Sequence, residues 1–72
     1  HKLPSKIKKQ FEKRLDIFVK NRTHPLLKIH PLSGNLAGYR AFSITGDYRV
    51  IYKILNQNQV KFIDIGTHNQ VY

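Results

Sequence analysis

The 72-residue chain contains no cysteine, methionine or tryptophan, and it has few acidic residues. Without cysteine, neither a disulfide nor a thiolate metal site can supplement the modest core that so short a chain buries. No apolar run approaches the roughly 20 residues of a membrane span, and no segment resembles a signal peptide. These absences favour a single small domain, residues 1–72, in a reducing cytoplasm.

Negative charge is the scarcest property of the chain. Only 4 Asp and Glu residues oppose 13 Lys and Arg residues, which gives a net charge of +9 and a pI of about 10.2. Such a field attracts polyanions and speeds encounter with them. Nucleic acid and an acidic protein are therefore the natural partners. A membrane surface is disfavoured, because the basic helix described next needs its apolar stripe for the core.

One amphipathic helix is predicted over residues 5–21. Pro4 suits the first turn of a helix, and Pro25 disfavours helical backbone at His24. The predicted core stripe consists of Ile7, Phe11, Leu15, Phe18 and Val19. The remaining, solvated surface of this helix carries Lys6, Lys8, Lys9, Lys13, Arg14 and Lys20.

The rest of the chain predicts a loop followed by a small antiparallel sheet. Residues 22–37 hold two His-Pro pairs and a Ser-Gly turn signal, which are typical of a surface loop. Strands are then expected at about 38–44, 47–55 and 60–66. The predicted fold class is α+β, with one main helix packed on a three-stranded antiparallel sheet.

Turn chemistry sets the expected strand pairing. Thr45-Gly46 predicts a tight hairpin that pairs Phe42 with Arg49, and a turn near residues 57–58 pairs Leu55 with Val60. Period-two alternation then divides the side chains between two faces. The predicted core face holds Ala41, Ser43, Val50, Tyr52, Ile54, Ile63 and Ile65. The predicted open face holds Arg40, Phe42, Arg49, Ile51, Lys53, Phe62 and Asp64, with His68 just beyond the last strand.

Several short motifs, in this order and spacing, resemble the RelE/ParE superfamily of bacterial toxins from toxin–antitoxin pairs, with the YafQ-like branch as the best match. They are His30-Pro31-Leu32, Gly38-Tyr39-Arg40, Asp47-Tyr48-Arg49-Val50-Ile51-Tyr52-Lys53, Gly66-Thr67-His68 and Tyr72. The resemblance implies a RelE/ParE-like fold and a ribosome-dependent mRNA endonuclease neutralised by a cognate antitoxin. It also implies that the family's N-terminal strand and most of its first helix are absent here.

Carried over by position, the resemblance assigns a role to each of five residues. His68 would be the acid–base histidine, and Tyr72 the C-terminal aromatic near the scissile bond. His30 matches a loop histidine, Asp47 an acidic residue of the YafQ branch, and Arg49 a strand arginine that holds phosphate. At two further positions, where YafQ-like enzymes carry an acid and a histidine, the chain has Ala41 and Ser43.

RNA cleavage by the 2′-OH needs a base, an acid and positive charge at the phosphate. We expect His68 and His30 to transfer protons, and Arg40, Arg49 and Lys53 to bind phosphate. No cofactor is expected, and the histidines lack metal-ligand spacing. Two alternatives stay open: a ParE-like toxin that inhibits DNA gyrase, and a weak or truncated toxin that only binds its antitoxin. The nuclease hypothesis requires the arginines and the His68 ring to share one side of the sheet.

Overall fold

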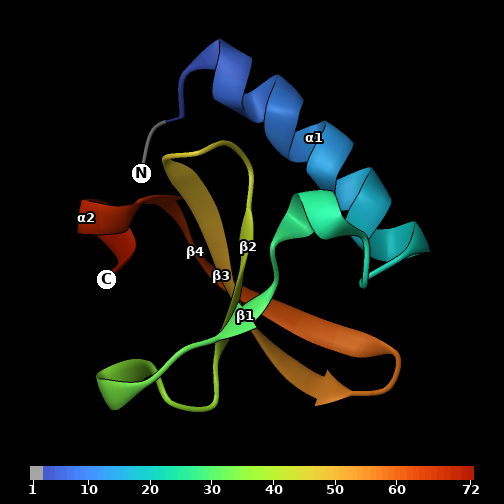
Figure 1. Ribbon diagram of the computed structural model, residues 1–72, viewed down its shortest axis with the longest axis vertical. Helices are drawn as coiled ribbons and strands as arrows, with labels where there is room; N and C mark the ends of the chain where they lie inside the picture. The colour runs from blue at the N-terminus through green and yellow to red at the C-terminus, as the bar shows by residue number, and fades with distance from the viewer. Residues whose placement is uncertain (1–2) are drawn as a thin grey trace.

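One main helix packs on a twisted antiparallel sheet in the computed structural model, which describes residues 3–72 (Figure 1). The elements are α1 (Ser5–Lys20), η1 (Pro25–Leu27), β1 (His30–Pro31), η2 (Gly34–Leu36), β2 (Arg40–Ser43), β3 (Tyr48–Asn56), β4 (Gln59–Thr67) and α2 (His68–Val71). The strands lie in the order β1-β2-β3-β4. The predicted α+β class is confirmed, but the sheet has four strands rather than three. No helix within residues 3–72 has both the length and the apolar character needed to cross a bilayer.

Helix α1 contacts the sheet through a stripe that differs in part from the predicted one. Phe18 is 3% exposed and lies at its centre, and Ile7, Phe11 and Ile17 pack against the same core. Val19 is 76% exposed, so its assignment to the stripe is wrong. Ile17 takes its place because α1 meets the sheet on the side that carries residues 7, 11 and 18.

Arg14 also departs from its predicted place on the solvated surface of α1. Its Nη1 donates to the Leu26 carbonyl at 2.6 Å and to the Ser43 carbonyl at 3.0 Å. One guanidinium therefore joins α1 both to the segment that follows it and to the end of β2. A charge-assisted donor between two carbonyls stabilises this junction in a way that helical periodicity does not reveal.

The segment predicted as a plain loop, residues 22–37, contains two short 3₁₀ helices and strand β1. His30 pairs with Ala41, and Pro31 pairs with Arg40. Leu27 at the end of η1 is fully buried in the core. The pairing of β1 fixes the position of His30 at the edge of the sheet, which a free loop would not do.

The β2–β3 hairpin pairs one residue away from the predicted register. Phe42 lies opposite Val50 and Ser43 opposite Arg49, whereas the sequence predicted Phe42 opposite Arg49. The Ile44 N–H donates to the Tyr48 carbonyl at 2.8 Å, so the loop has one residue more than a two-residue turn. Because a one-residue slip moves every side chain to the other face, the predicted faces of β2 are wrong.

The β3–β4 hairpin contains a second departure from the predicted register. Ile54, rather than Leu55, lies opposite Val60, and the pairing shifts again between Ile51 and Tyr52. This irregularity leaves Ile63 without a ladder partner and turns Phe62 toward α1. The Phe62 ring lies 6.0 Å from the Phe18 ring, which corrects its predicted place on the open face.

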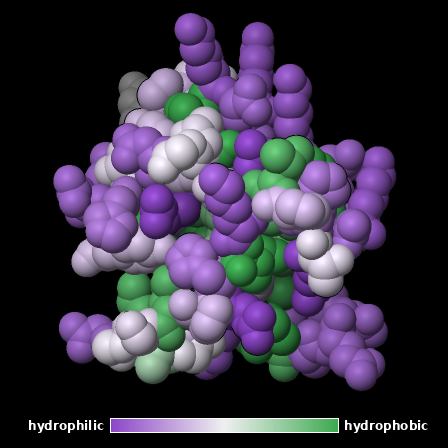
Figure 2. Space-filling view, in the orientation of Figure 1, coloured by the Kyte–Doolittle hydropathy of each residue, from purple (hydrophilic) through white to green (hydrophobic). Residues whose placement is uncertain are grey.

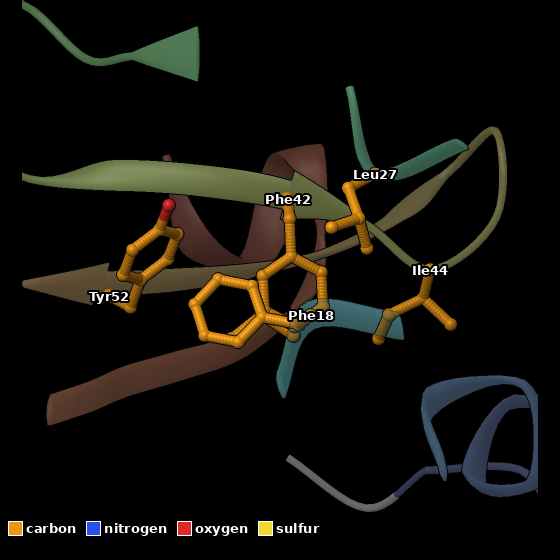
Figure 3. Packing of buried hydrophobic residues seen from close by; sticks show 6 residues of the cluster. Phe18, Leu27, Phe42, Ile44 and Tyr52 are labelled. Carbon is orange, nitrogen blue, oxygen red and sulfur yellow. The ribbon is translucent and has the colours of Figure 1, made fainter. Parts of the chain in front are cut away.

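We call the side of the sheet that meets α1 the helix face and the opposite side the far face. The core lies on the helix face, where Phe18 stacks on Phe42 (ring centroids 4.9 Å apart) and meets Tyr52 edge-on at 5.1 Å (Figure 3). Leu27 and Ile44 close the cluster. On the far face, Ala41 and Ile51 are also buried, so that face is only partly open. Figure 2 shows hydrophilic side chains projecting from α1 and separating smaller apolar areas.

Candidate functional site

Arg49 lies near the start of β3 and is half-buried on the far face, opposite Ser43 and Gly66 in the ladder. Its guanidinium lies over the Tyr72 ring, 5.2 Å from the centroid, and its Nη1 donates to Tyr72 Oη at 3.4 Å. The Nε atom is buried without a hydrogen-bond partner. A buried donor left unpaired is rare in native proteins. Arg49 is therefore held in place by an aromatic ring and retains donor capacity for an anion.

Helix α2 brings the C-terminal aromatic back toward this arginine. Thr67 and Gln70 form a capping box, in which the Thr67 N–H donates to Gln70 Oε1 at 2.8 Å. The Tyr72 N–H donates to the His68 carbonyl at 3.0 Å, which closes the turn. The His68 and Tyr72 rings meet edge to face with centroids 4.5 Å apart. The short helix thus links His68, Tyr72 and Arg49 in one chain of contacts.

His30 approaches the same region from β1. Its Nδ1 lies 3.0 Å from the Lys28 carbonyl, so in the tautomer that protonates Nδ1 the Nε2 atom is free to accept a proton. His30 and Tyr72 line one hollow of about 420 Å³. His30 and Arg49, together with Lys28 and Ser43, line a second hollow of about 290 Å³. His30 therefore stands between two hollows, one bordered by the aromatic ring and the other by the arginine.

Lys53 shares the far face with Arg49 because both residues occupy odd positions along β3. Four residues of strand separate them by about 13 Å. The Lys53 ammonium lies 5.9 Å from the Tyr39 ring centroid. Lys53 is thus too far along the strand to share a phosphate with Arg49, although it lies on the same surface.

Arg40 does not belong to this cluster. It lies opposite Tyr52 in the ladder, which places it on the helix face. There it lines a different hollow, with Arg22 and His24. The prediction that Arg40 shares a pocket with Arg49 and His68 is wrong, so of the two arginines only Arg49 meets the requirement that the nuclease hypothesis set. The cause is the extra residue in the β2–β3 loop, which turns β2 over relative to β3.

Three other positions have structural explanations. Asp47 is exposed in the bend before β3, where its N–H donates to Thr45 Oγ1 at 3.3 Å. Ser43 Oγ donates to the Thr45 carbonyl at 2.9 Å and also borders the hollow beside Arg49. Ala41 is fully buried. Asp47 thus serves the turn by position, and Ser43 is the one hydroxyl among the described residues that line the hollow shared by His30 and Arg49.

Lys28 is the residue that sequence reasoning missed. It borders the hollow shared by His30 and Arg49, and its backbone is left-handed, with φ 48° and ψ 43°. The sequence offered only one hint, its place two residues before His30. Across residues 3–72, no group of three or more histidine, aspartate or glutamate side chains is arranged to hold a metal ion.

Comparison with known proteins identifies relatives of this chain. The YafQ family model, described as a bacterial toxin of a type II toxin–antitoxin system, matches residues 2–72. The crystal structure of YafQ from E. coli strain BL21(DE3) superposes with a TM-score of 0.76 at 22% identity, over 90% of this chain and 73% of that one. No curated protein sequence gave a significant match.

Two further similar structures contain an antitoxin. YafQ in the E. coli DinJ–YafQ toxin–antitoxin complex matches with a TM-score of 0.72 at 25% identity, over 90% of this chain and 72% of that one. The YoeB–YefM complex from Staphylococcus aureus matches with a TM-score of 0.69 at 25% identity, over 88% and 72%. Because the family model spans nearly the whole chain, the chain belongs to the YafQ family of type II toxin–antitoxin toxins, within the RelE/ParE superfamily.

Proposed function

We propose that this chain is a ribosome-dependent mRNA endonuclease that cleaves by attack of a ribose 2′-OH, without a metal ion. The observation that carries the proposal is the contact chain from Arg49 through Tyr72 to His68 on the far face, with His30 across the adjoining hollows. A cation, two imidazoles and an aromatic ring lie along these contacts and hollows, which supports the proposal. Those are the groups that in-line phosphodiester cleavage requires.

In the proposed reaction, O2′ forms a bond to the adjacent phosphorus while the bond from phosphorus to O5′ breaks. One histidine takes the 2′-OH proton, and the other gives a proton to the departing O5′. The products are a 2′,3′-cyclic phosphate and a 5′-hydroxyl. His68 is exposed on α2 and His30 is exposed on β1, so both imidazoles can exchange protons with solvent between turnovers.

Arg49 stabilises the charge that develops on the phosphate. Its donor-rich guanidinium is already oriented by Tyr72 and is half-buried, so little reorganisation accompanies binding. Tyr72 is also 43% exposed, so its ring is accessible to a base of the RNA. Lys53, about 13 Å along the same face, binds a phosphate farther along the RNA strand. Arg40 lies on the helix face and takes no part in the chemistry. Asp47 is exposed in the bend before β3, and an acid–base role for it stays a prediction.

Primer extension on ribosome-bound mRNA tests this function directly. Induced wild-type protein is expected to give new 5′ ends, and His68→Ala is expected to remove them. Asn69→Ala is the matched control, because Asn69 is the exposed neighbour on the same short helix. Cuts that persist in His68→Ala would contradict the assignment. Filamentation with gyrase–DNA adducts and no RNA cuts would instead establish the gyrase-inhibiting alternative.

A cognate antitoxin is the second partner that we propose, by analogy with the antitoxin complexes of the similar toxins. A hollow of about 820 Å³ lies between α1 and the β3–β4 hairpin, bordered by Val19, Leu55 and Arg22. Val19 and Leu55 are more than half exposed. Exposed apolar side chains on a strongly basic protein suit an acidic, amphipathic segment that folds on contact.

Co-expression with the antitoxin tests this surface. Leu55→Asp is expected to abolish neutralisation while leaving RNA cleavage intact, because it introduces a buried charge only in the complex. Lys6→Asp is the control, since it makes a larger charge change, two units rather than one, at an exposed position of α1. Full neutralisation of Leu55→Asp would exclude this surface.

A further inference from the structure

A second cationic hollow lies on the helix face, away from the candidate site. It measures about 430 Å³, and its lining includes Arg22, His24, Lys28, Arg40 and the Tyr52 side chain. None of the described residues that line it is a carboxylate. Three permanent cations around one hollow create a local positive field that attracts anions. We call this hollow the basic pocket.

The cations of the basic pocket keep most of their donor capacity. Within residues 3–72, the side chains of Arg22, Lys28 and Arg40 make no hydrogen bond or ion pair with the protein. The Arg22 guanidinium is held 5.1 Å from the Phe18 ring centroid, which fixes its direction. Burial raises the pKa of the Tyr52 hydroxyl, so this group stays protonated and able to donate.

Lys28 joins the basic pocket to the candidate site. It borders the basic pocket and also the hollow that Arg49 and His30 share. Among the described residues other than glycine, it alone has a positive φ, a conformation that costs roughly 1–2 kcal/mol. Its carbonyl contacts His30 Nδ1 at 3.0 Å. The strained backbone thus sets a lysine between two hollows on opposite faces, beside the short edge strand β1.

The hollows then follow one another around the β1 edge. Lys28 is common to the first two, and His30 is common to the second hollow and the one that Tyr72 borders. A ligand that fills them all must carry anionic groups at short, regular intervals along a flexible chain. A single RNA strand has one phosphate per nucleotide and meets that requirement. An acidic peptide places its carboxylates less regularly and has no use for the acid–base groups at the end of the track.

We propose that one RNA strand runs from the candidate site, past Lys28 and around the β1 edge, to the basic pocket, where Arg40 and Arg22 bind its backbone phosphates. The inference rests on the proposed function for the identity of the RNA. It gives Arg40 a role on the helix face, and it extends the RNA-binding surface beyond the nucleotides at the scissile bond.

Binding of two 2′-O-methyl oligonucleotides, one of about three and one of about ten nucleotides, tests the track. The methyl groups block cleavage, so binding is measured apart from chemistry. The variant is Lys28→Gln with Arg40→Gln, which keeps the Arg22 stacking intact. The control is Lys8→Gln with Lys13→Gln, which removes the same charge from exposed positions of α1. Circular dichroism confirms that each protein is folded.

The double variant is expected to bind the long oligonucleotide about tenfold more weakly and the short one within about twofold of wild type. Its salt dependence on the long oligonucleotide should fall by roughly 0.7 per lost phosphate contact. The control should change both affinities equally and slightly. The track is contradicted if the double variant loses affinity equally for both oligonucleotides, or if the control loses as much affinity as the double variant. It is also contradicted if the wild type binds neither oligonucleotide.

Polyglutamate serves as the acidic-peptide probe in the same assay. If the variant loses polyglutamate binding but keeps the long oligonucleotide, the pocket belongs to an acidic protein and the inference is wrong. Failure of the proposed nuclease function gives a different result from failure of the RNA track. In that case the length-dependent binding of the blocked oligonucleotide persists, while the ribosome-bound mRNA shows no cuts that depend on His68.

Discussion

At the scale of single residues, the candidate site depends on Tyr72. Its ring contacts the His68 imidazole edge-on at 4.5 Å and lies under the Arg49 guanidinium at 5.2 Å. Its hydroxyl adds only a long contact of 3.4 Å. The ring therefore positions both neighbours, and the hydroxyl contributes little.

Two substitutions at Tyr72 separate the ring from the hydroxyl. Tyr72→Phe is expected to keep cleavage within about threefold of wild type, because it removes only the weak hydrogen bond. Tyr72→Ala removes the cation–π contact and frees both neighbours, and it should slow cleavage by about 10–100-fold. Single-turnover rates on purified ribosomes measure both. A loss with Phe as large as the loss with Ala would mean that the hydroxyl itself transfers protons.

A second residue-scale prediction concerns pH. Burial raises the pKa of Tyr52 above its ordinary value of 10.0, although Arg40 and Arg22 oppose the shift. The unfolded chain therefore loses this proton first as pH rises. The contribution of the protonated Tyr52 hydroxyl to folding stability is therefore complete below about pH 10. It declines as pH rises from there to the pKa of the folded state. Urea unfolding should show wild type losing stability relative to Tyr52→Phe above pH 10. If the unfolding free energies of the two proteins change in parallel with pH, this hydroxyl is not buried as described.

At the scale of elements, the sequence predicted which helices and strands exist better than it predicted how the strands pair. The main helix and the three longer strands follow from apolar periodicity and turn residues, and each lies close to its expected range. Strand β1 was missed because two residues, one of them proline, give no periodic signal. The side-chain faces were missed because the length of one loop decides them. Thr45-Gly46 reads as a two-residue turn, but Asp47 also belongs to the loop.

The same dependence on strand pairing decided which residues of the candidate site could be predicted from the sequence. His68, Tyr72 and Arg49 come together because the β3–β4 pairing and the capping box of α2 fix them, and motif order predicted all three. Arg40 was placed on the wrong face by the one-residue slip. Lys28 was missed because its position depends on a left-handed backbone that no residue pattern indicates.

Two adjacent residues of α1 test how this element meets the sheet. Phe18→Ala should cost about 3–5 kcal/mol of unfolding free energy, because the ring is buried against Phe42 and Tyr52. Val19→Ala should cost less than about 0.5 kcal/mol, since Val19 is exposed. Urea titrations followed by circular dichroism give both values. Comparable losses at the two positions would show that α1 is rotated relative to this description.

At the scale of the whole molecule, which carries a net charge of +9, cations lie on both faces of the sheet. Arg49 and Lys53 lie on the far face, and Arg22 and Arg40 on the helix face. Lys28 stands at the edge between them. This distribution suits a flexible polyanion that bends around the β1 edge better than a rigid duplex lying on one face.

A double-mutant cycle on single-turnover mRNA cleavage by purified ribosomes tests the central claim most directly, that Arg49 and His68 act on one phosphate. His68→Ala and Arg49→Gln should each slow cleavage by about 10²–10⁴-fold. The double variant should be only slightly slower than the worse single variant, because groups that act together are not additive. Effects that multiply fully would place the two side chains in independent steps and contradict the account.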